Sequence, residues 1–282
     1  MSGVGMSNLV SADWLAARLD SVILLDASIH RDDSSFGDGR ADFEGSHLPG
    51  ALFADLFGAF SDPSAEFGFT RPSAEQFEAA ARAVGIDDDS TVVVYDRLTG
   101  AWAARLWWVF RSFGFADIRV LDGGLAAWVS AGGALVDGSA PAVAVGSVRA
   151  RPQDGFFVDV RTVKQLSDAT EVPVVCALRR PDYVGSADEP RSGHIPGSVN
   201  LPYPDLLDAD GTLSLDAVRS GAGELGLEKG SPAVLYCGGG INAAGLALAL
   251  TEAGYHGLSV YDGSMNEWRA DPTLPVVVGE TP

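Results

Sequence analysis

One stretch of the chain combines a potential nucleophile with a backbone that can stabilise an anion. Residues 234–242 read VLYCGGGIN, and an apolar run continues to Leu250. The apolar residues before the cysteine favour a strand, the glycines allow a turn, and Asn242 suits the N-cap of a following helix. Free N–H groups and the dipole at the start of that helix would stabilise a thiolate. We therefore predict a nucleophilic Cys237, held in a loop formed by Gly238, Gly239, Gly240, Ile241 and Asn242.

The overall composition is that of a globular protein with an acidic surface. The chain has 282 residues, of which 46% are hydrophobic, and its formal net charge is −19. This length allows two domains of about 140 residues each. A surface of this charge repels nucleic acids and anionic membranes, so we expect neither as a partner. An anionic substrate would need a local positive pocket.

Cysteine and histidine are too scarce for a disulfide framework or a metal cage. Cys176 and Cys237 are the two cysteines, and four histidines are scattered along the chain. We therefore expect no metal and no cofactor. No apolar run is long enough to span a membrane, and the first residues lack the charged and apolar regions of a leader peptide. These features predict a cytoplasmic protein, and they leave its oligomeric state open.

The two halves of the chain repeat one series of landmarks. In the first half, these are an apolar strand at 22–26, HLPGA at 47–51, a strand at 92–96, and VLDGG at 120–124 followed by Trp128. The counterparts in the second half are an apolar strand at 172–176, HIPGS at 194–198, a strand at 233–237, and VYDGS at 260–264 followed by Trp268. Four landmarks in the same order predict a duplicated α/β domain.

Alternating strands and helices predict the architecture of each repeat. Helical patterns at 73–84 and 101–113 separate the strands, so we expect a mainly parallel sheet with helices on both faces. The predicted domains are 1–137 and 155–282, joined by a glycine- and proline-rich linker at 138–154. Ligands bind beyond the carboxyl ends of such strands. Cys237 and its counterpart Asp96 both stand at such an end.

These landmarks resemble the two-domain rhodanese family of thiosulfate and 3-mercaptopyruvate sulfurtransferases. The paired HLPGA and HIPGS segments, LWWVFR at 106–111, LDGGL at 121–125 and YDGS at 261–264 carry the resemblance over nearly the whole chain. It implies tandem rhodanese-like domains and a sulfane sulfur held as a persulfide on Cys237. The sulfur would come from a small anionic donor and pass to cyanide or a thiol. Asp96 at the mirrored position cannot carry a persulfide, so the first domain would be non-catalytic.

The chain departs from the family pattern around the substrate. The active-site loop resembles the CGSGVT sequence of mercaptopyruvate enzymes, but Gly239 replaces its serine. The resemblance places the acidic and histidine partners of that serine at Phe57 and Phe69, with Asp55 close by in a different register. These losses favour thiosulfate as donor, whereas the uncharged loop favours mercaptopyruvate.

One of the family's two substrate arginines is matched, by Arg191 in Glu189-Pro190-Arg191, and the other falls on Asp182. We predict Arg191 as the donor-binding cation, with Arg179 and Arg180 as further candidates, because arginine suits anions.

Other side chains have structural interpretations. Cys176 is expected to be a buried strand residue. His47 and His194, each two residues before a Pro-Gly turn, are expected to hold the turn by hydrogen bonding. Asp122 and Asp262 precede glycines and are predicted turn formers. Trp107, Trp108 and Phe110 are interpreted as core or inter-domain packing.

Three other functions fit parts of the sequence. Gly238-x-Gly240-x-x-Ala243 matches a dinucleotide-binding fingerprint, but the first-half copy lacks this pattern and the match comes late in the chain. A cysteine phosphatase would need arginine six residues after the nucleophile, where this chain has Ala243. The third alternative is a persulfide carrier or rhodanese-like scaffold with poor turnover.

Overall fold

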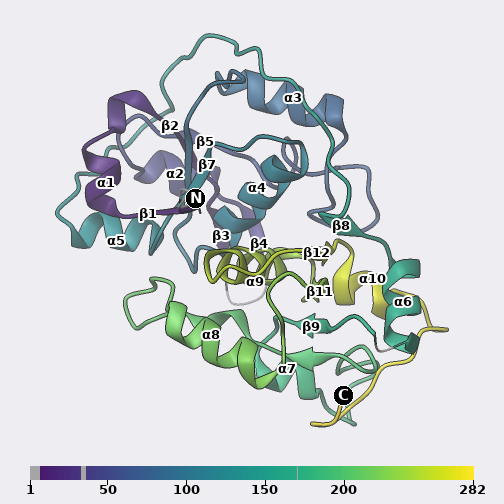
Figure 1. Cartoon of the computed structure of the whole chain (residues 1–282). Coiled ribbons are helices and arrows are strands. Elements are labelled where there is room, and N and C mark those ends of the chain that lie inside the picture. Colours follow the sequence, from purple (N-terminus) through teal and green to yellow (C-terminus); the bar gives the residue numbers. More distant parts are fainter. Residues whose placement is uncertain (1–6, 33–35, 170) are drawn as a thin grey trace.

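Two five-stranded sheets form the framework of the molecule (Figure 1). The structure is a computed structural model, and it describes residues 7–32, 36–169 and 171–282. The first sheet contains β1 (Leu9–Val10), β2 (Ile23–Asp26), β5 (Leu52–Phe53), β6 (Val92–Tyr95) and β7 (Ile118–Leu121). The second contains β8 (Phe157–Val158), β9 (Val174–Cys176), β10 (Val199–Asn200), β11 (Ala233–Tyr236) and β12 (Leu258–Tyr261). A hairpin of β3 (Ile29–Arg31) and β4 (Phe36–Asp38) is separate from both sheets.

Helices connect the strands throughout both halves. The first half holds α1 (Ala12–Ala16), α2 (Arg40–Gly45), α3 (Ala74–Ala83), α4 (Ala101–Ser112), α5 (Gly124–Ser130) and a 3-10 turn at Leu19–Ser21. The second half holds α6 (Val160–Ala169), α7 (Arg180–Val184), α8 (Leu215–Glu224), α9 (Ile241–Glu252), α10 (Ser264–Ala270) and a 3-10 turn at Tyr203–Leu206.

The two sheets have the same topology, which confirms the predicted duplication. Their strand orders are β1-β7-β6-β2-β5 and β8-β12-β11-β9-β10, and every pair within them is parallel. In both, the strand before the predicted functional position is central: β6 lies between β7 and β2, and β11 between β12 and β9. The carboxyl end of a central parallel strand is where such sheets place their ligands.

Both faces of each sheet are covered, as predicted. Alternate residues of a strand point to opposite faces, so Val93 and Tyr95 pack with α1, α2 and α5, whereas Val92 and Val94 pack toward α4. The second sheet repeats this arrangement, with Val234 and Tyr236 packing toward α6, α7 and α10. Strands buried on both faces read as continuous apolar runs, and this is why the central strands were recognisable in the sequence.

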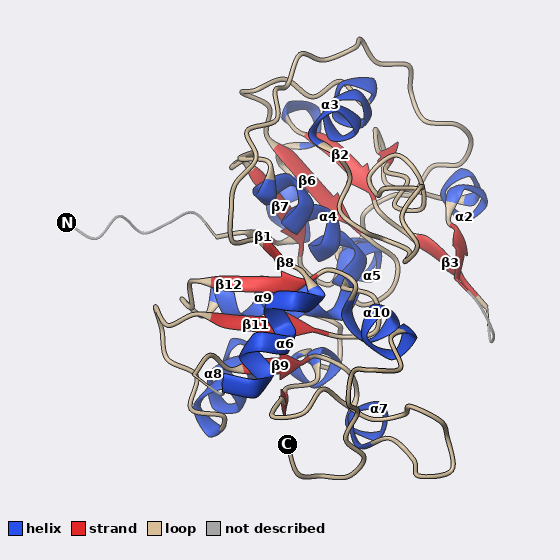
Figure 2. Cartoon of the chain, turned by 90° about the vertical axis from the view of Figure 1, so that its right-hand side faces the viewer, coloured by secondary structure: helices blue, strands red, loops and turns tan. Residues whose placement is uncertain are grey.

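Helices α4 and α9 join the two halves. Each covers the inner face of its own sheet and the two pack against each other, so both lie at the middle of the molecule (Figure 2). Side chains all round α9 are buried, as expected of a helix with apolar residues on every side. Trp108 Nε1 donates to the carbonyl of Phe156 at 3.0 Å, so the tryptophan-rich helix α4 also contacts the second half directly.

The two Pro-Gly turns repeat in atomic detail. His47 Nδ1 bonds the carbonyl of Phe43 and His194 Nδ1 that of Tyr183, both at 2.8 Å, and each imidazole stacks on the ring of that partner. Both histidines are buried. The prediction that they hold their turns by hydrogen bonding is therefore confirmed.

The stretch 138–154, predicted as a linker, contains no helix or strand. Its predicted boundaries stay a prediction. No helix in the described part of the chain is both long and apolar enough to cross a membrane. The expectation that the chain has no leader peptide concerns residues 1–6, which lie outside the described residues.

Candidate active site

The predicted loop connects a central strand directly to the central helix. Cys237 is the first residue after β11, and α9 begins at Ile241. Gly240 is the helix N-cap, with φ +79°, a conformation that favours glycine. The prediction that Asn242 caps the helix is therefore wrong. The chain reaches helical geometry two residues earlier than expected, so Asn242 already lies in the first turn.

Helix α10 fixes one side of this loop. The Cys237 N–H donates to Ser264 Oγ at 3.2 Å. In the opposite direction, the N–H groups of Met265 and Asn266 donate to the carbonyls of Cys237 and Gly238 at 3.0 and 2.9 Å. Two carbonyl groups of the loop therefore face α10. The N–H groups that follow them in the loop take no part in these bonds.

The following N–H groups form a set of unused donors. From Gly238 to Ala243, none of them donates a hydrogen bond to any residue that the structure describes. Some of these are the donors that every α-helix leaves unpaired in its first turn, and they carry the positive end of the helix dipole. The loop can therefore bind an anion without a charged side chain.

The corresponding loop of the first domain holds such an anion. Asp96, at the position of Cys237, receives four hydrogen bonds from its own loop and helix. Its Oδ1 accepts from the N–H groups of Leu98 (2.7 Å) and Gly100 (3.0 Å), and its Oδ2 from those of Trp102 and Ala103 (both 3.0 Å). Burial raises the pKa of Asp96, while these bonds act in the opposite direction. The first-domain loop is thus filled by its own carboxylate.

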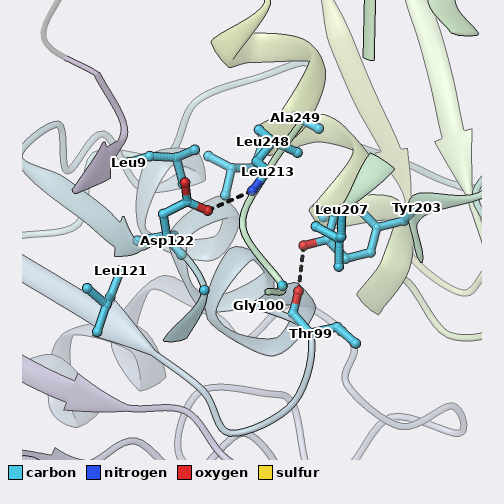
Figure 3. A pocket seen from close by; sticks show the side chains of 14 residues that line it. Leu9, Thr99, Gly100, Leu121, Asp122, Tyr203, Leu207, Leu213, Leu248 and Ala249 are labelled. Atoms are coloured by element: carbon cyan, nitrogen blue, oxygen red, sulfur yellow. Dashed lines mark hydrogen bonds between the residues drawn. The ribbon is translucent and has the colours of Figure 1, made fainter. Parts of the chain in front are cut away.

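A segment of the second domain closes off the first-domain loop. The Tyr203 hydroxyl donates to the carbonyl of Thr99 at 2.7 Å, and the Leu213 N–H donates to Asp122 Oδ1 at 2.9 Å (Figure 3). The small pocket that remains is lined by residues of both domains, among them Leu9, Gly100, Leu207 and Leu248. Asp122, predicted as a turn former, therefore also reaches across the domain interface.

A similar contact between the domains occurs beside the Cys237 loop, where an aspartate of the second domain binds residues of the first. Asp262 Oδ2 accepts from the N–H of Arg71 at 2.8 Å, and its Oδ1 pairs with Arg105 Nη2 at 2.5 Å. Asp262 is a predicted turn former, and no sequence motif marks Arg105 as functional. Arg105 stands in an aromatic run of α4 that read as packing, and its only unusual feature in the sequence is a charge among those apolar neighbours.

An aromatic cluster of the first domain approaches the Cys237 loop through the ring of Phe69. A Cβ placed on Gly239 would lie 4.0 Å from the Phe69 ring, and Phe69 packs edge-on against Phe57 and Trp102 with centroids 4.9 Å apart in each pair. Only 2% of Cys237 is exposed. Phe57 and Phe69, which the family resemblance places at the positions of an acid and a histidine, therefore belong to an apolar wall of aromatic side chains.

The predicted donor-binding arginine Arg191 contacts the far end of α10. Its Nε and Nη2 donate to the carbonyls of Arg269, Trp268, Asp271 and Leu274 at 2.7–3.0 Å. Two of these bonds reach carbonyls in the last turn of α10, which the C-terminus of a helix leaves unpaired, and the other two reach the segment that follows the helix. Arg191 therefore stabilises the helix whose N-terminus holds Cys237, and its role in donor binding stays a prediction.

Arg179 and Arg180 lie at the same edge of the sheet as Cys237. They follow β9, whose residue Cys176 is paired with Tyr236, the residue before Cys237. Arg180 forms an exposed ion pair with Glu280, whereas the exposed side chain of Arg179 makes no hydrogen bond or ion pair with any described residue. Neither is locked in the fold, and their substrate roles also stay predictions.

Cys176 has the features expected of a structural residue. Its side chain is fully buried among apolar residues on the outer face of the second sheet. Burial raises the pKa of this thiol to about 12, so it stays protonated near neutral pH. Both cysteines are free thiols. Among the described residues, no cluster of histidine, cysteine and carboxylate side chains could hold a metal ion.

Comparisons with known proteins agree with this arrangement. The rhodanese-like domain family matches residues 11–131 and 145–271. Human 3-mercaptopyruvate sulfurtransferase is 35% identical, with 94% of this chain and 93% of the relative covered. Thiosulfate/3-mercaptopyruvate sulfurtransferase 1 of Arabidopsis thaliana is 34% identical, with 95% and 77% covered. The solved structure of SseA from Escherichia coli superposes with a TM-score of 0.81 at 29% identity, covering 92% of this chain and 99% of that one.

Both halves match one domain family, and the relatives match over nearly the whole chain. The chain therefore belongs to the rhodanese-like family and is a two-domain sulfurtransferase.

Proposed function

We propose that the protein carries a sulfane sulfur as a persulfide on Cys237 and moves it from a small anionic donor to cyanide or a thiol. The observation that carries this proposal is the pair of matching loops. In one, the N–H groups surround the Asp96 carboxylate, and in the other the corresponding donors are free around Cys237. Since the first loop holds two partly negative oxygens, the second can hold a sulfur carrying a second, partly negative sulfur.

The reaction requires two displacements at sulfur. The Cys237 thiolate attacks the sulfane sulfur of thiosulfate, the sulfur–sulfur bond of the donor breaks, and sulfite leaves with the electron pair. The acceptor, cyanide or a thiolate, then attacks the outer sulfur of the persulfide, and Cys237 leaves as thiolate. Free N–H donors at the helix N-terminus stabilise the negative charge on the cysteine before the first step and after the second.

We propose thiosulfate as the preferred donor. Relatives are named for both thiosulfate and 3-mercaptopyruvate, so the support comes from this chain's own residues. Phe57 and Phe69 provide neither charge nor a proton acceptor where related enzymes place the acid and histidine. Thiosulfate needs no proton removed from its transferred sulfur, whereas the thiol of mercaptopyruvate does.

The test is to measure the mass of the protein after incubation with each donor. With thiosulfate we expect a gain of one sulfur atom, about 32 Da, that is lost on adding cyanide. With 3-mercaptopyruvate we expect slower loading. Faster loading from mercaptopyruvate would reverse the donor preference, and an unchanged mass with both donors would contradict the persulfide itself.

The near-complete burial of Cys237 favours one alternative, a persulfide carrier with slow turnover. The same experiment separates the two functions. A carrier gains one sulfur but forms little more thiocyanate than one equivalent, whereas an enzyme continues to form thiocyanate while donor and cyanide remain.

We infer a cytoplasmic location from the two free cysteines, since reduced thiols are typical of that compartment.

Replacing Arg191 with alanine is expected to lower the free energy of unfolding by about 2–4 kcal/mol, because four main-chain carbonyls lose a charged donor. Thermal or denaturant unfolding measures this loss. If Arg191 also binds the donor, as the sequence predicts, the KM for thiosulfate will rise more than kcat falls. An unchanged KM in the folded variant would remove Arg191 from the substrate site and leave it a structural role alone.

A further inference from the structure

Arg105 is a buried cation of the first domain that faces the catalytic loop of the second. Its side chain is fully buried in α4. Nη2 donates to the carbonyl of Phe69 and to Asp262 Oδ1, and the guanidinium lies over the ring of Phe157, 4.8 Å from its centroid. One first-domain residue therefore joins a loop of its own domain to the end of β12 in the other.

The opposite side of this guanidinium has no partner. Nε and Nη1 are buried and make no hydrogen bond to any described residue. Nη1 points toward the catalytic loop, because a Cβ placed on Gly240 would lie only 2.9 Å from it. An unsatisfied buried donor is costly, and more so on a charged group. The pairing with Asp262 thus leaves part of the charge directed at the loop that carries Cys237.

Arg105 also holds the aromatic wall in place. Phe69 has φ +67°, an unfavourable conformation for a bulky side chain. Such a conformation persists only where several contacts impose it. The bond from Arg105 to the Phe69 carbonyl supplies one contact, and the bond from the Arg71 N–H to Asp262 fixes the chain two residues later.

We propose that Arg105 is a positioning residue supplied by the non-catalytic domain, which favours the thiolate form of Cys237 and keeps Phe69 over the loop. This role of Arg105 refines the proposed function. It rests on that function in one respect only, that the Cys237 thiolate goes on to accept a sulfur. Ionisable groups that interact with Arg105, Asp262 or Cys237 include Asp262 itself after β12, Glu267 on α10, Arg71 in the first domain and Cys176 on β9. Of these, Asp262 is the group that directly offsets the charge of Arg105.

The experiment measures the rate of iodoacetamide alkylation of Cys237 at about pH 7 and about pH 9.5, in full-length chains that also carry Cys176→Ala. The ratio used is the alkylation rate at about pH 9.5 divided by the rate at about pH 7. It reports the charge near the thiol, because a change in access alters both rates equally. Arg105→Met is expected to raise the ratio about tenfold, since the thiolate loses a nearby cation. Asp262→Asn is expected to lower it, because the negative charge opposing Arg105 is removed.

Two further variants serve as controls. Arg105→Lys keeps the charge and should keep the ratio close to that of the parent chain. Arg82→Met changes the net charge equally but lies on α3, paired with Glu78, and should not alter the ratio. An unchanged ratio in folded Arg105→Met, or a ratio in Asp262→Asn that rises or stays the same, overturns the proposal. If Arg105→Met does not fold, the Asp262→Asn result decides.

Failure of the proposed function gives a different result. Alkylation requires no sulfur donor, so the ratios can follow the expected pattern in a protein that never gains a sulfur from thiosulfate. Conversely, normal loading of the persulfide with unchanged ratios leaves the proposed function intact and removes Arg105 from it.

Discussion

Replacing Cys237 with serine is expected to abolish sulfur transfer, lowering the rate of thiocyanate formation from thiosulfate and cyanide by about 10³-fold or more. A serine hydroxyl stays protonated near neutral pH and cannot form the sulfur–sulfur bond of a persulfide. The variant should also show no gain in mass on incubation with either donor.

The matched control is Cys176→Ala. This second cysteine lies one strand away on the outer face of the sheet, and burial raises its pKa to about 12. We expect that variant to keep its rate within about twofold, because a protonated, enclosed thiol takes no part in the displacement. Residual transfer by Cys237→Ser that disappears on adding Cys176→Ala would move the persulfide to the other cysteine.

Replacing Gly240 with alanine is expected to reduce the rate of sulfur transfer by about 10²-fold, because small displacements of a reacting group are costly. Gly240 has φ +79°, and an added Cβ would lie 3.1 Å from the carbonyl oxygen of Asp262 and 2.9 Å from Arg105 Nη1. Both neighbours are held by other contacts, so the loop must move and its N–H groups lose their common direction.

Gly230→Ala separates this effect from backbone strain alone. Gly230 has a similar φ of +88°, but nothing lies within 4 Å of the position of its Cβ. Both variants should lose about 1–2 kcal/mol of stability from the left-handed conformation, and only Gly240→Ala should lose activity. Equal losses of activity in the two variants would show that the close approach at Gly240 does not matter.

The fold could be predicted from the sequence because its signals are local. Central strands such as β6 and β11 are buried on both faces, so each appears as a continuous apolar run. The repeated landmarks gave the duplication, and the order of strands in the two sheets agrees with it. The helix cap was predicted wrongly because Asn242 has the better capping propensity, whereas the backbone at Gly240 decides where the helix begins.

The contacts between the domains could not be predicted in the same way. Arg105 and Asp262 are 157 residues apart in sequence, and no periodicity relates a helix of one domain to a strand end of the other. Asp262 before a glycine is a typical turn residue, and the sequence did not reveal that its carboxylate extends to another domain. Similarly, Arg191 in a family motif suggested an anion ligand, while its observed partners are main-chain carbonyls at the end of α10.

The helix pair at the middle of the molecule limits how the chain can be divided. Residues from Ala243 to Leu250 are buried all round α9, and much of that cover is α4 from the other half. A fragment containing only the second half would expose this apolar side to water and is expected to self-associate. The half that carries Cys237 therefore depends on the half that carries Asp96 to cover its central helix, and we expect that cutting the chain between the repeats would not yield two independently stable domains.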